Sequence, residues 1–350
     1  MELSDRRKLI LKLAIQEYVE ATRPVASETL QKKYSLVFSS ATIRNELAAL
    51  EEQGLLTHLH TSAGRVPTDA GYRYYVENLM ERTPLSAQEQ RTIQHQFYQV
   101  RGELDQWIHL AAAVLVRSTQ NAAVVTPPRA HETRFKHLEL IAIHDSVILL
   151  MLVLGDGAIK QQSLTLEQVW QQDELSRVAG RLNDLLRDAD ATRIQALRAG
   201  TCDPPLGPFA ELVVDALLRA MQQREGQLNE QLHHDGLFEM LRQPEFENVG
   251  RVRDVLEILE SRTGIAPLIP QALASEGVQV IIGGEHGSDK MRDYSVILAR
   301  YGLGHNVVGI VGLLGPTRMA YPRSISTVRY ISAVMSDLLA EMYGSSANNQ

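Results

Sequence analysis

The chain has 350 residues, 44% of them apolar, and a formal net charge of −7. This length suggests two or three domains, and the apolar content suffices for real cores, which excludes widespread disorder. The single cysteine, Cys202, excludes an internal disulfide framework and a thiolate metal cluster. The charged N-terminus does not read as a signal peptide, and the longest apolar run, Val147 to Leu154, is too short to span a bilayer. We therefore expect a cytoplasmic protein without a membrane partner.

The negative charge argues against DNA binding only at first sight. Residues 1–82 carry 11 Lys/Arg and 11 Asp/Glu, so the whole deficit lies downstream. A neutral segment must attract phosphates through a local basic cluster. It would also need two copies to bind DNA tightly.

Helices are predicted throughout the first 53 residues. Apolar spacing predicts the first over 5–20. The second is expected over 25–34, with Ser27 as its N-cap. The third is expected over 41–53, with Ser40 as its N-cap.

The third helix has two different faces. Ile43, Leu47 and Leu50 share one face and are expected to pack on the first two helices. The opposite face carries small or hydrogen-bonding side chains: Ala41, Thr42, Arg44, Asn45 and Ala48. Arginine pairs bidentately with guanine and asparagine with adenine. Acidic residues crowd the later turns, so the N-terminal half of this helix is expected to point at DNA.

A β-hairpin is predicted directly after this helix. Residues 55–60 alternate like a strand, a turn follows, and Arg65 begins a return strand. Gly64 is expected to relieve backbone strain at the tip, and Arg65 to reach a phosphate or the minor groove. His58 and His60 are spaced like a metal pair, but no third ligand with suitable spacing follows, which favours a phosphate contact or plain hairpin surface. Three helices followed by a hairpin are typical of a winged helix-turn-helix.

The predicted DNA-binding residues are therefore Ser40, Thr42, Arg44, Asn45, His58, His60, Ser62, Gly64 and Arg65.

Beyond residue 82, strands alternate with helical stretches. The strands are predicted at 122–126, 135–143, 147–154, 159–166, 278–282, 295–301 and 307–314. The helices are predicted at 86–118, 167–188, 208–234, 236–242, 250–262 and 324–343. Strands, a helical interruption and further strands suggest one α+β domain with another inserted into it. The last two strands resemble the closing hairpin of a GAF fold.

An enzyme is the alternative from another class. The segment Gly283 to Lys290 holds glycines, a carboxylate, a histidine and a lysine. It is not a P-loop, and no hydrolase elbow, zinc-protease or dinucleotide motif occurs in the chain. A polar turn between two strands is the favoured interpretation. Arg318 and Tyr321 would line a pocket or lie at a domain interface, and the interface is favoured.

Several motifs resemble those of a known family. Pro24 to Ser27, Ser40 to Leu47 and the long run His60 to Arg73 are similar to the heat-inducible transcription repressor family, HrcA. The run Gly315 to Tyr321 is similar as well, so the resemblance spans nearly the whole chain.

The resemblance implies a homodimer that binds double-stranded DNA at an inverted-repeat operator. This operator would lie upstream of heat-shock chaperone operons, which the dimer would repress until heat stress releases it. The resemblance also implies that the GroEL chaperonin keeps the repressor in its active fold. No enzyme activity, cofactor or metal is expected.

The resulting fold class is α+β. We expect an N-terminal winged helix-turn-helix at 1–82 and a GAF-like α/β domain in two parts, 83–164 and 276–350. An inserted, mainly helical dimerisation domain is expected at 165–275. GAF domains often bind small ligands, so a ligand-responsive GAF-type regulator of a metabolic operon stays open as an alternative. No ligand-specific group of residues is apparent.

Overall fold

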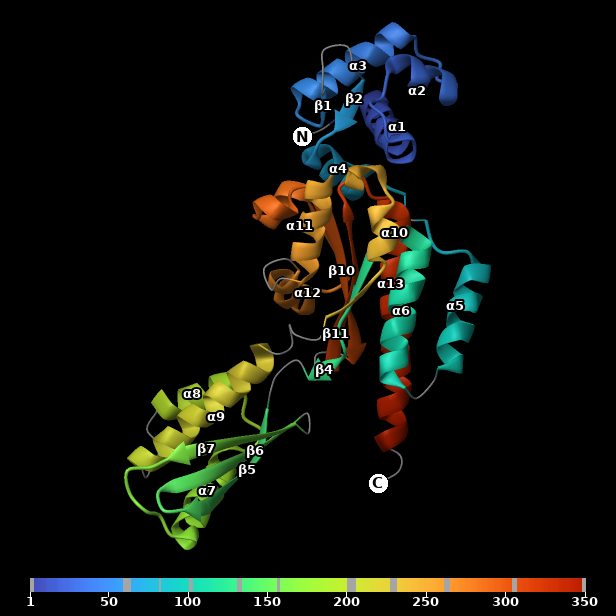
Figure 1. Ribbon diagram of the computed structural model, residues 1–350. Helices are drawn as coiled ribbons and strands as arrows, with labels where there is room; N and C mark the ends of the chain where they lie inside the picture. The colour runs from blue at the N-terminus through green and yellow to red at the C-terminus, as the bar shows by residue number, and fades with distance from the viewer. Residues whose placement is uncertain are drawn as a thin grey trace. The chain divides into compact units, whose positions relative to one another are not determined.

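The computed structural model describes residues 3–58, 64–81, 83–100, 103–130, 134–155, 158–199, 206–226, 232–260, 265–303 and 307–347. The chain divides into two compact units (Figure 1). Unit 1 comprises Met1–Pro127, Leu232–Gly302 and Gly309–Gln350. Unit 2 comprises Pro128–Gln231 and Leu303–Val308.

Unit 1 begins with helices that are followed by a small antiparallel sheet. The elements are α1 (Asp5–Ala21), α2 (Ser27–Lys33), α3 (Ser40–Glu52), β1 (Leu56–His58) and β2 (Arg65–Pro67). Their core consists of apolar side chains that are at most 1% exposed: Ile10, Leu11, Ile15, Leu30, Ile43, Leu47 and Leu50. The helical periodicity of the sequence therefore identified the buried faces.

The helix caps differ from those expected. Ser39, with extended backbone angles, caps α3 and accepts a hydrogen bond from the Thr42 backbone N–H at 3.1 Å. Ser40 is instead the first helical residue, and its Oγ lies 3.0 Å from the Oγ of Ser27. The prediction of Ser27 and Ser40 as N-caps is wrong. At α3 the adjacent serines carry the same sequence signal, and only the backbone angles decide which one caps. At α2 the cap position is held by Ala26, which makes no side-chain cap bond.

Close backbone approaches explain two glycines around the hairpin. A Cβ on Gly64 would lie 2.6 Å from the carbonyl carbon and oxygen of Val25. A Cβ on Gly71 would lie 2.1 Å from the carbonyl oxygen of Leu55. Gly64 is therefore needed where the hairpin meets the segment before α2.

The predicted long helix over 86–118 is wrong, because the structure has two helices there. The following elements complete this part of unit 1: α4 (Asp69–Tyr74), the π-helical turn η1 (Tyr75–Leu79), α5 (Ala87–Gln99) and α6 (Leu104–Thr119). A capping box between Ser86 and Glu89 starts α5. The indole N–H of Trp107 donates to the Val100 carbonyl at 2.9 Å and so holds α6 against the end of α5.

The main sheet of unit 1 has the strand order β8-β3-β11-β10-β9. Its strands are β3 (Ala122–Val125), β8 (His233–Asp235), β9 (Val278–Ile282), β10 (Tyr294–Leu303) and β11 (Val307–Pro316), and β4 (Arg129–Ala130) pairs with the start of β11. The helix predicted over 208–234 is wrong at its end. Residues 233–235 form a strand instead, because they pair with β3 at the edge of the sheet.

Helices cover both faces of this sheet (Figure 1). One face carries α10 (Leu237–Leu241), α11 (Val249–Glu260) and α12 (Ile269–Ala274), with the short helical turns η3 (Pro244–Glu247), η4 (Ala266–Leu268), η5 (Gly283–His286) and η6 (Asp289–Met291). On the other face, α6 packs against α13 (Tyr321–Ala347). Because both faces are buried, β10 and β11 are apolar almost throughout instead of alternating.

Unit 2 packs helices on one face of a three-stranded antiparallel sheet. Its elements are β5 (Phe135–His144), β6 (Val147–Leu154), β7 (Ile159–Thr165), α7 (Gln172–Leu186), α8 (Ala191–Ala199) and α9 (Pro208–Gly226). Burial alternates residue by residue along β6, as expected for a sheet with one covered face. The core includes Leu140, Leu150 and Leu152 from the sheet, and Leu182 and Val213 from the helices.

The border expected at residue 165 does not separate the units. The side-chain amide of Asn183 in α7 bonds both backbone groups of Leu138, at 2.8 and 3.0 Å. The amide of Gln172 bonds the Ala142 N–H and the Leu140 carbonyl, both at 2.9 Å. Since α7 satisfies the edge of β5 in this way, the strands and α7 form one unit. The helices α10–α12, expected in the insertion, pack instead in the core of unit 1.

Candidate nucleic-acid interface

The helix α3 separates buried and exposed side chains sharply. Ile43, Leu47 and Leu50 are buried, whereas Arg44 and Asn45 are exposed. Within the described ranges, Arg44 forms no ion pair. An exposed guanidinium beside an exposed amide offers the donor and acceptor groups that read guanine and adenine edges.

The acidic residue in the middle of α3, Glu46, is held inside the N-terminal part of unit 1. Glu46 is 6% exposed and accepts hydrogen bonds from Arg6 Nε at 2.7 Å and from Arg7 Nε at 2.9 Å. Burial alone would raise the pKa of Glu46, but the bonds from Arg7 and Arg6 lower it below its usual value. This carboxylate is therefore paired within the fold and does not face an approaching phosphate.

A second acidic residue of α3, Glu51, binds one side chain on each strand of the hairpin. His58 and Arg65 lie directly opposite each other in the β1–β2 register. Arg65 Nε donates to Glu51 Oε2 at 2.9 Å, and His58 Nδ1 is hydrogen-bonded to Glu51 Oε1. The bond with His58, and then that from Arg65, lowers the pKa of Glu51 despite an opposing effect of burial. Arg65 is therefore partly neutralised, with 22% of its side chain exposed.

The backbone of Arg65 fixes the hairpin to the segment before α2. The Arg65 N–H donates to the Val25 carbonyl at 2.9 Å, and the Val25 N–H donates to the Arg65 carbonyl at 2.8 Å. The hairpin is thus joined to the segment before α2 through this backbone bridge and to α3 through Glu51.

The structure brings most of the predicted site residues together. Thr42, Arg44 and Asn45 lie on α3, with Arg44 and Asn45 most exposed, while Ser40 is turned toward Ser27. His58, Gly64 and Arg65 lie around the hairpin, and His60 and Ser62 fall outside the described residues. Sequence reasoning missed the roles of Glu46, Arg6 and Arg7, because pairings across 39 or 40 positions leave no local signal. It also missed Glu51, whose partners His58 and Arg65 lie 7 and 14 positions away on other elements.

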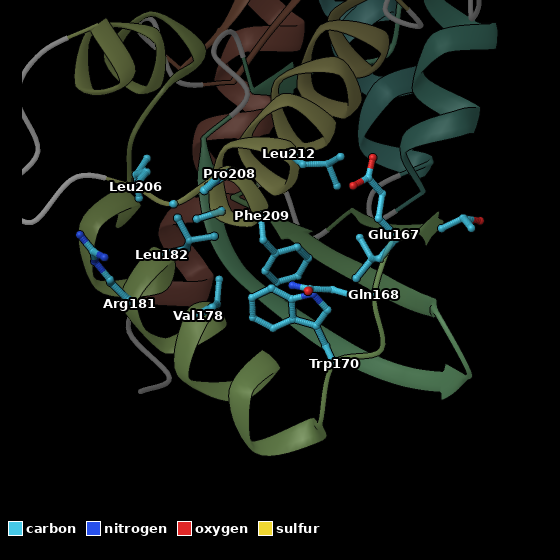
Figure 2. A pocket seen from close by; sticks show the side chains of 14 residues that line it. Glu167, Gln168, Trp170, Val178, Arg181, Leu182, Leu206, Pro208, Phe209 and Leu212 are labelled. Carbon is cyan, nitrogen blue, oxygen red and sulfur yellow. The ribbon is translucent and has the colours of Figure 1, made fainter.

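A pocket of about 890 Å³ in unit 2 is a second candidate site (Figure 2). The rings of Trp170 and Phe209 lie 4.3 Å apart between their centroids on its floor. Val178 and Leu182 of α7 form one wall, and Arg181 lies at the rim. Such a pocket would accept an apolar group. It lies in unit 2, apart from the sheet for which a GAF-like ligand site would be expected.

The described parts of the chain carry neither a membrane-spanning helix nor a cluster of metal ligands. No helix there has both the length and the apolar character needed to cross a membrane. Nor do three or more His, Cys, Asp or Glu side chains gather there as a metal site would require.

Comparisons with known proteins agree with one another. A family model described as "HrcA protein C terminal domain" matches residues 105–325. The heat-inducible transcription repressor HrcA of Herpetosiphon aurantiacus is 62% identical over 346 residues, which are 98% of this chain and 97% of that protein. The protein of the same name from Roseiflexus castenholzii is 63% identical over 346 residues, 98% of this chain and 96% of that protein.

One solved structure, described as a hypothetical protein at 2.2 Å resolution, is similar over nearly the full length. It aligns with a TM-score of 0.60 and 24% identity, covering 97% of this chain and 99% of that chain. This similarity shows a shared fold.

Proposed function

The chain belongs to the HrcA family of heat-inducible transcription repressors, and from this membership we propose that it silences heat-shock chaperone operons by binding an inverted-repeat operator through α3 and the β1–β2 hairpin. Negative regulation of transcription through DNA is the activity of this family, which is not one of enzymes. The N-terminal module, defined here as residues 3–58 and 64–81, would act as a winged helix-turn-helix. The order of its helices and hairpin supports that assignment.

The observation that carries the proposal is the exposed pair Arg44 and Asn45 in the first half of α3. Both side chains are presented by a helix whose opposite face is fully buried, so their direction is set by the core. The neighbouring Ala41 and Ala48 are small and permit close approach to a groove floor.

Gel-shift titrations with an inverted-repeat chaperone operator test this function. We expect tight binding to the operator and at least about a thousandfold weaker binding to a scrambled duplex of equal length and charge at the same salt concentration. Equal affinity for both duplexes would refute sequence-specific repression.

The remaining architecture is proposed to be a GAF-like domain with an insertion. Unit 1 supports the first part, because helices cover both faces of its sheet. Unit 2 supports the second part, because its residues interrupt those of unit 1 in the chain. The role of dimerisation domain, first expected for residues 165–275, is therefore proposed for unit 2.

Exposed apolar side chains on the strands of unit 2 support a dimer contact there. Ile141 is 39% exposed, Ile143 52% and Ile159 61%. Apolar groups gathered on one sheet are a common sign of an interface. A second copy of the chain would cover them, and two N-terminal modules would then match the two half-sites of an inverted repeat.

Sedimentation of Ile143→Asp tests the dimer. A charge buried at an interface is costly, so we expect this variant to sediment as a monomer where the parent chain is a dimer. Phe238→Asp is the control, since Phe238 is 78% exposed in unit 1. A dimer that persists in Ile143→Asp would contradict the proposed contact.

The GroEL chaperonin is proposed as a partner that maintains the folded repressor. The family resemblance alone supports this partner. Operator binding is to be followed after a heat pulse, with and without chaperonin and ATP. Recovery only with chaperonin is expected, and equal recovery in both cases would exclude the dependence.

A further inference from the structure

Polar contacts join the N-terminal module to the sheet of unit 1, and we propose that Arg73 and Arg318 are positioning residues that hold α3 at one orientation for DNA. The proposal rests on the DNA-binding function above. It gives a role to Gly283 to Lys290, which was expected to be a polar turn between strands, and to Gly315 to Tyr321, where an interface was favoured for Arg318 and Tyr321.

Arg318 joins α1 to the sheet core. It lies just beyond β11 and donates from Nη1 to the Val19 carbonyl at 2.6 Å. Val19 lies in the last turn of α1, where carbonyls lack a donor within the helix and a cation is favoured. The same guanidinium binds Glu245 through Nε at 2.5 Å and Nη2 at 3.1 Å. With only 13% of its side chain exposed, Arg318 is a built-in bridge and not a loose surface contact.

Arg73 makes the second contact, from α4 to the end of β9. Its guanidinium binds both carboxylate oxygens of Glu285 and donates to the Val280 carbonyl at 2.6 Å. The planar guanidinium holds the carboxylate through two bonds, and such a pair fixes the relative orientation of the two side chains.

The first residue of α4 completes this contact. The Gly284 N–H donates to Asp69 Oδ2 at 2.9 Å. Gly283 has φ +52, and a Cβ there would lie 2.3 Å from the Asp69 carboxylate. The glycines of this turn therefore admit a carboxylate from the N-terminal module.

A buried aromatic contact also joins the N-terminal module to the rest of unit 1. The rings of Tyr72 and Tyr321 are 5.7 Å apart between centroids, and the side chains are 2% and 0% exposed. Tyr321 is held in place by a hydrogen bond with Ser295 Oγ at 2.8 Å. Hydrogen bonds and ion pairs near these buried rings are electrostatically stronger than they would be in water, so they hold the N-terminal module more firmly.

These contacts matter for DNA because two modules must reach two half-sites together. A dimer that holds its modules rigidly binds one half-site spacing well and others poorly. Neither Arg73 nor Arg318 lies on the exposed face of α3, so each acts on binding through the orientation of the module.

The preference for one half-site spacing over another is the quantity to measure. A residue that only stabilises the fold would not change this preference. The parent chain and the variants Arg73→Ala and Arg318→Ala are titrated with the operator and with an operator lengthened by about 5 bp, half a helical turn, between the half-sites. We expect the variants to bind the natural operator about tenfold more weakly and to discriminate less between the two spacings. Equal weakening on both operators, with unchanged discrimination, would overturn the proposal.

Rescue and control variants make the test specific. The exchange Arg73→Glu with Glu285→Arg restores opposite charges, and we expect it to recover much of the spacing preference lost in Arg73→Ala. Arg292→Ala is the control, since Arg292 is 71% exposed and pairs only with the nearby Asp289 among described residues.

A measurement without DNA separates this proposal from the proposed function. Spin labels are attached at Thr29 in α2 and Ala340 in α13, both exposed, after Cys202→Ser, and the protein is diluted with unlabelled chain. We expect a narrow distance distribution for the parent and a broad one for Arg318→Ala. A distance distribution that is unchanged in Arg318→Ala would refute the positioning role of Arg318. A distribution that broadens, together with a parent chain that does not bind the operator, would refute only the DNA function.

Discussion

The helix α3 and the β1–β2 hairpin are both proposed to touch DNA, but they present their cations differently. Arg44 on α3 is exposed and forms no ion pair within the described residues, whereas Arg65 on the hairpin is bonded to Glu51. The helix is therefore ready to bind, while the hairpin must exchange a carboxylate for a phosphate. Under the proposed function, α3 would therefore supply the discrimination between bases, and the hairpin would supply a phosphate contact for which Glu51 competes.

The largest effect is expected where the hairpin meets the helices. In Gly64→Ala the new Cβ would meet backbone atoms of Val25 at 2.6 Å, so the bridge between Val25 and Arg65 must open. We expect a loss of about 3 kcal/mol in the stability of the module, at the upper end for overpacking, because backbone atoms cannot turn aside. Denaturant unfolding followed by circular dichroism measures it.

Gly180 offers a matched control for this substitution. It lies in α7, and no atom lies within 4 Å of its added Cβ. Gly180→Ala should stabilise its helix by about 0.5–1 kcal/mol. Destabilisation of similar size in both variants would show that the close approach at Gly64 is not the cause.

Next in size is the loss of base discrimination in Asn45→Ala. An amide that pairs with adenine contributes about 1–3 kcal/mol of discrimination against other bases. We expect operator affinity to fall while affinity for scrambled DNA stays the same, as measured by competition titrations. If both affinities fell together, α3 would not be the reading element.

Arg65→Ala should have a smaller and more uniform effect. The loss of one phosphate contact should weaken binding to every sequence by about 1 kcal/mol and reduce the slope of log K against log salt by about 1. Titrations from low to high salt give the slope. A selective loss for the operator alone would remove the distinction between hairpin and helix.

Glu51→Gln should change DNA binding in the opposite direction to Arg65→Ala. A neutral amide holds Arg65 less tightly, so we expect operator binding to strengthen by up to about 1 kcal/mol. Glu52→Gln changes the same charge on an exposed neighbour that forms no bond to Arg65 among the described residues. Equal gains in both variants would indicate a general charge effect and not release of Arg65.

The smallest effect is a change in stability at acidic pH. The pKa of Glu51 is lowered from its usual 4.5 in the folded chain. A lowered carboxyl pKa adds stability that is present above the usual value and is lost as pH falls through the lowered one. The stability of the parent should therefore drop more than that of Glu51→Gln below about pH 4.5. Parallel curves for the two proteins would mean that the cluster contributes nothing to folding.

The sequence predicted the local elements well where one face is buried. The periodicities of α1 and α3 were recognised because burial of one face imposes a repeat of 3.6, whereas β6 and β10 were recognised as short apolar runs bounded by turns. The strand β8 was assigned to a helix because three polar residues carry no repeat, and α8 and α12 were overlooked for a similar reason. The N-cap of α3 was misplaced by one residue because Ser39 and Ser40 are equivalent in sequence, and that of α2 because its cap is Ala26, which carries no capping signal.

The sequence by itself determined the family, the order of elements in the N-terminal module and the residues on the exposed face of α3. These depend on motifs and on contacts between near neighbours. Only the tertiary structure decided that Glu46 binds Arg6 and Arg7, that Glu51 holds Arg65, and that Arg73 and Arg318 join the module to the sheet. Such pairs bring together groups up to 299 positions apart, and their energies depend on burial and geometry that no local pattern encodes.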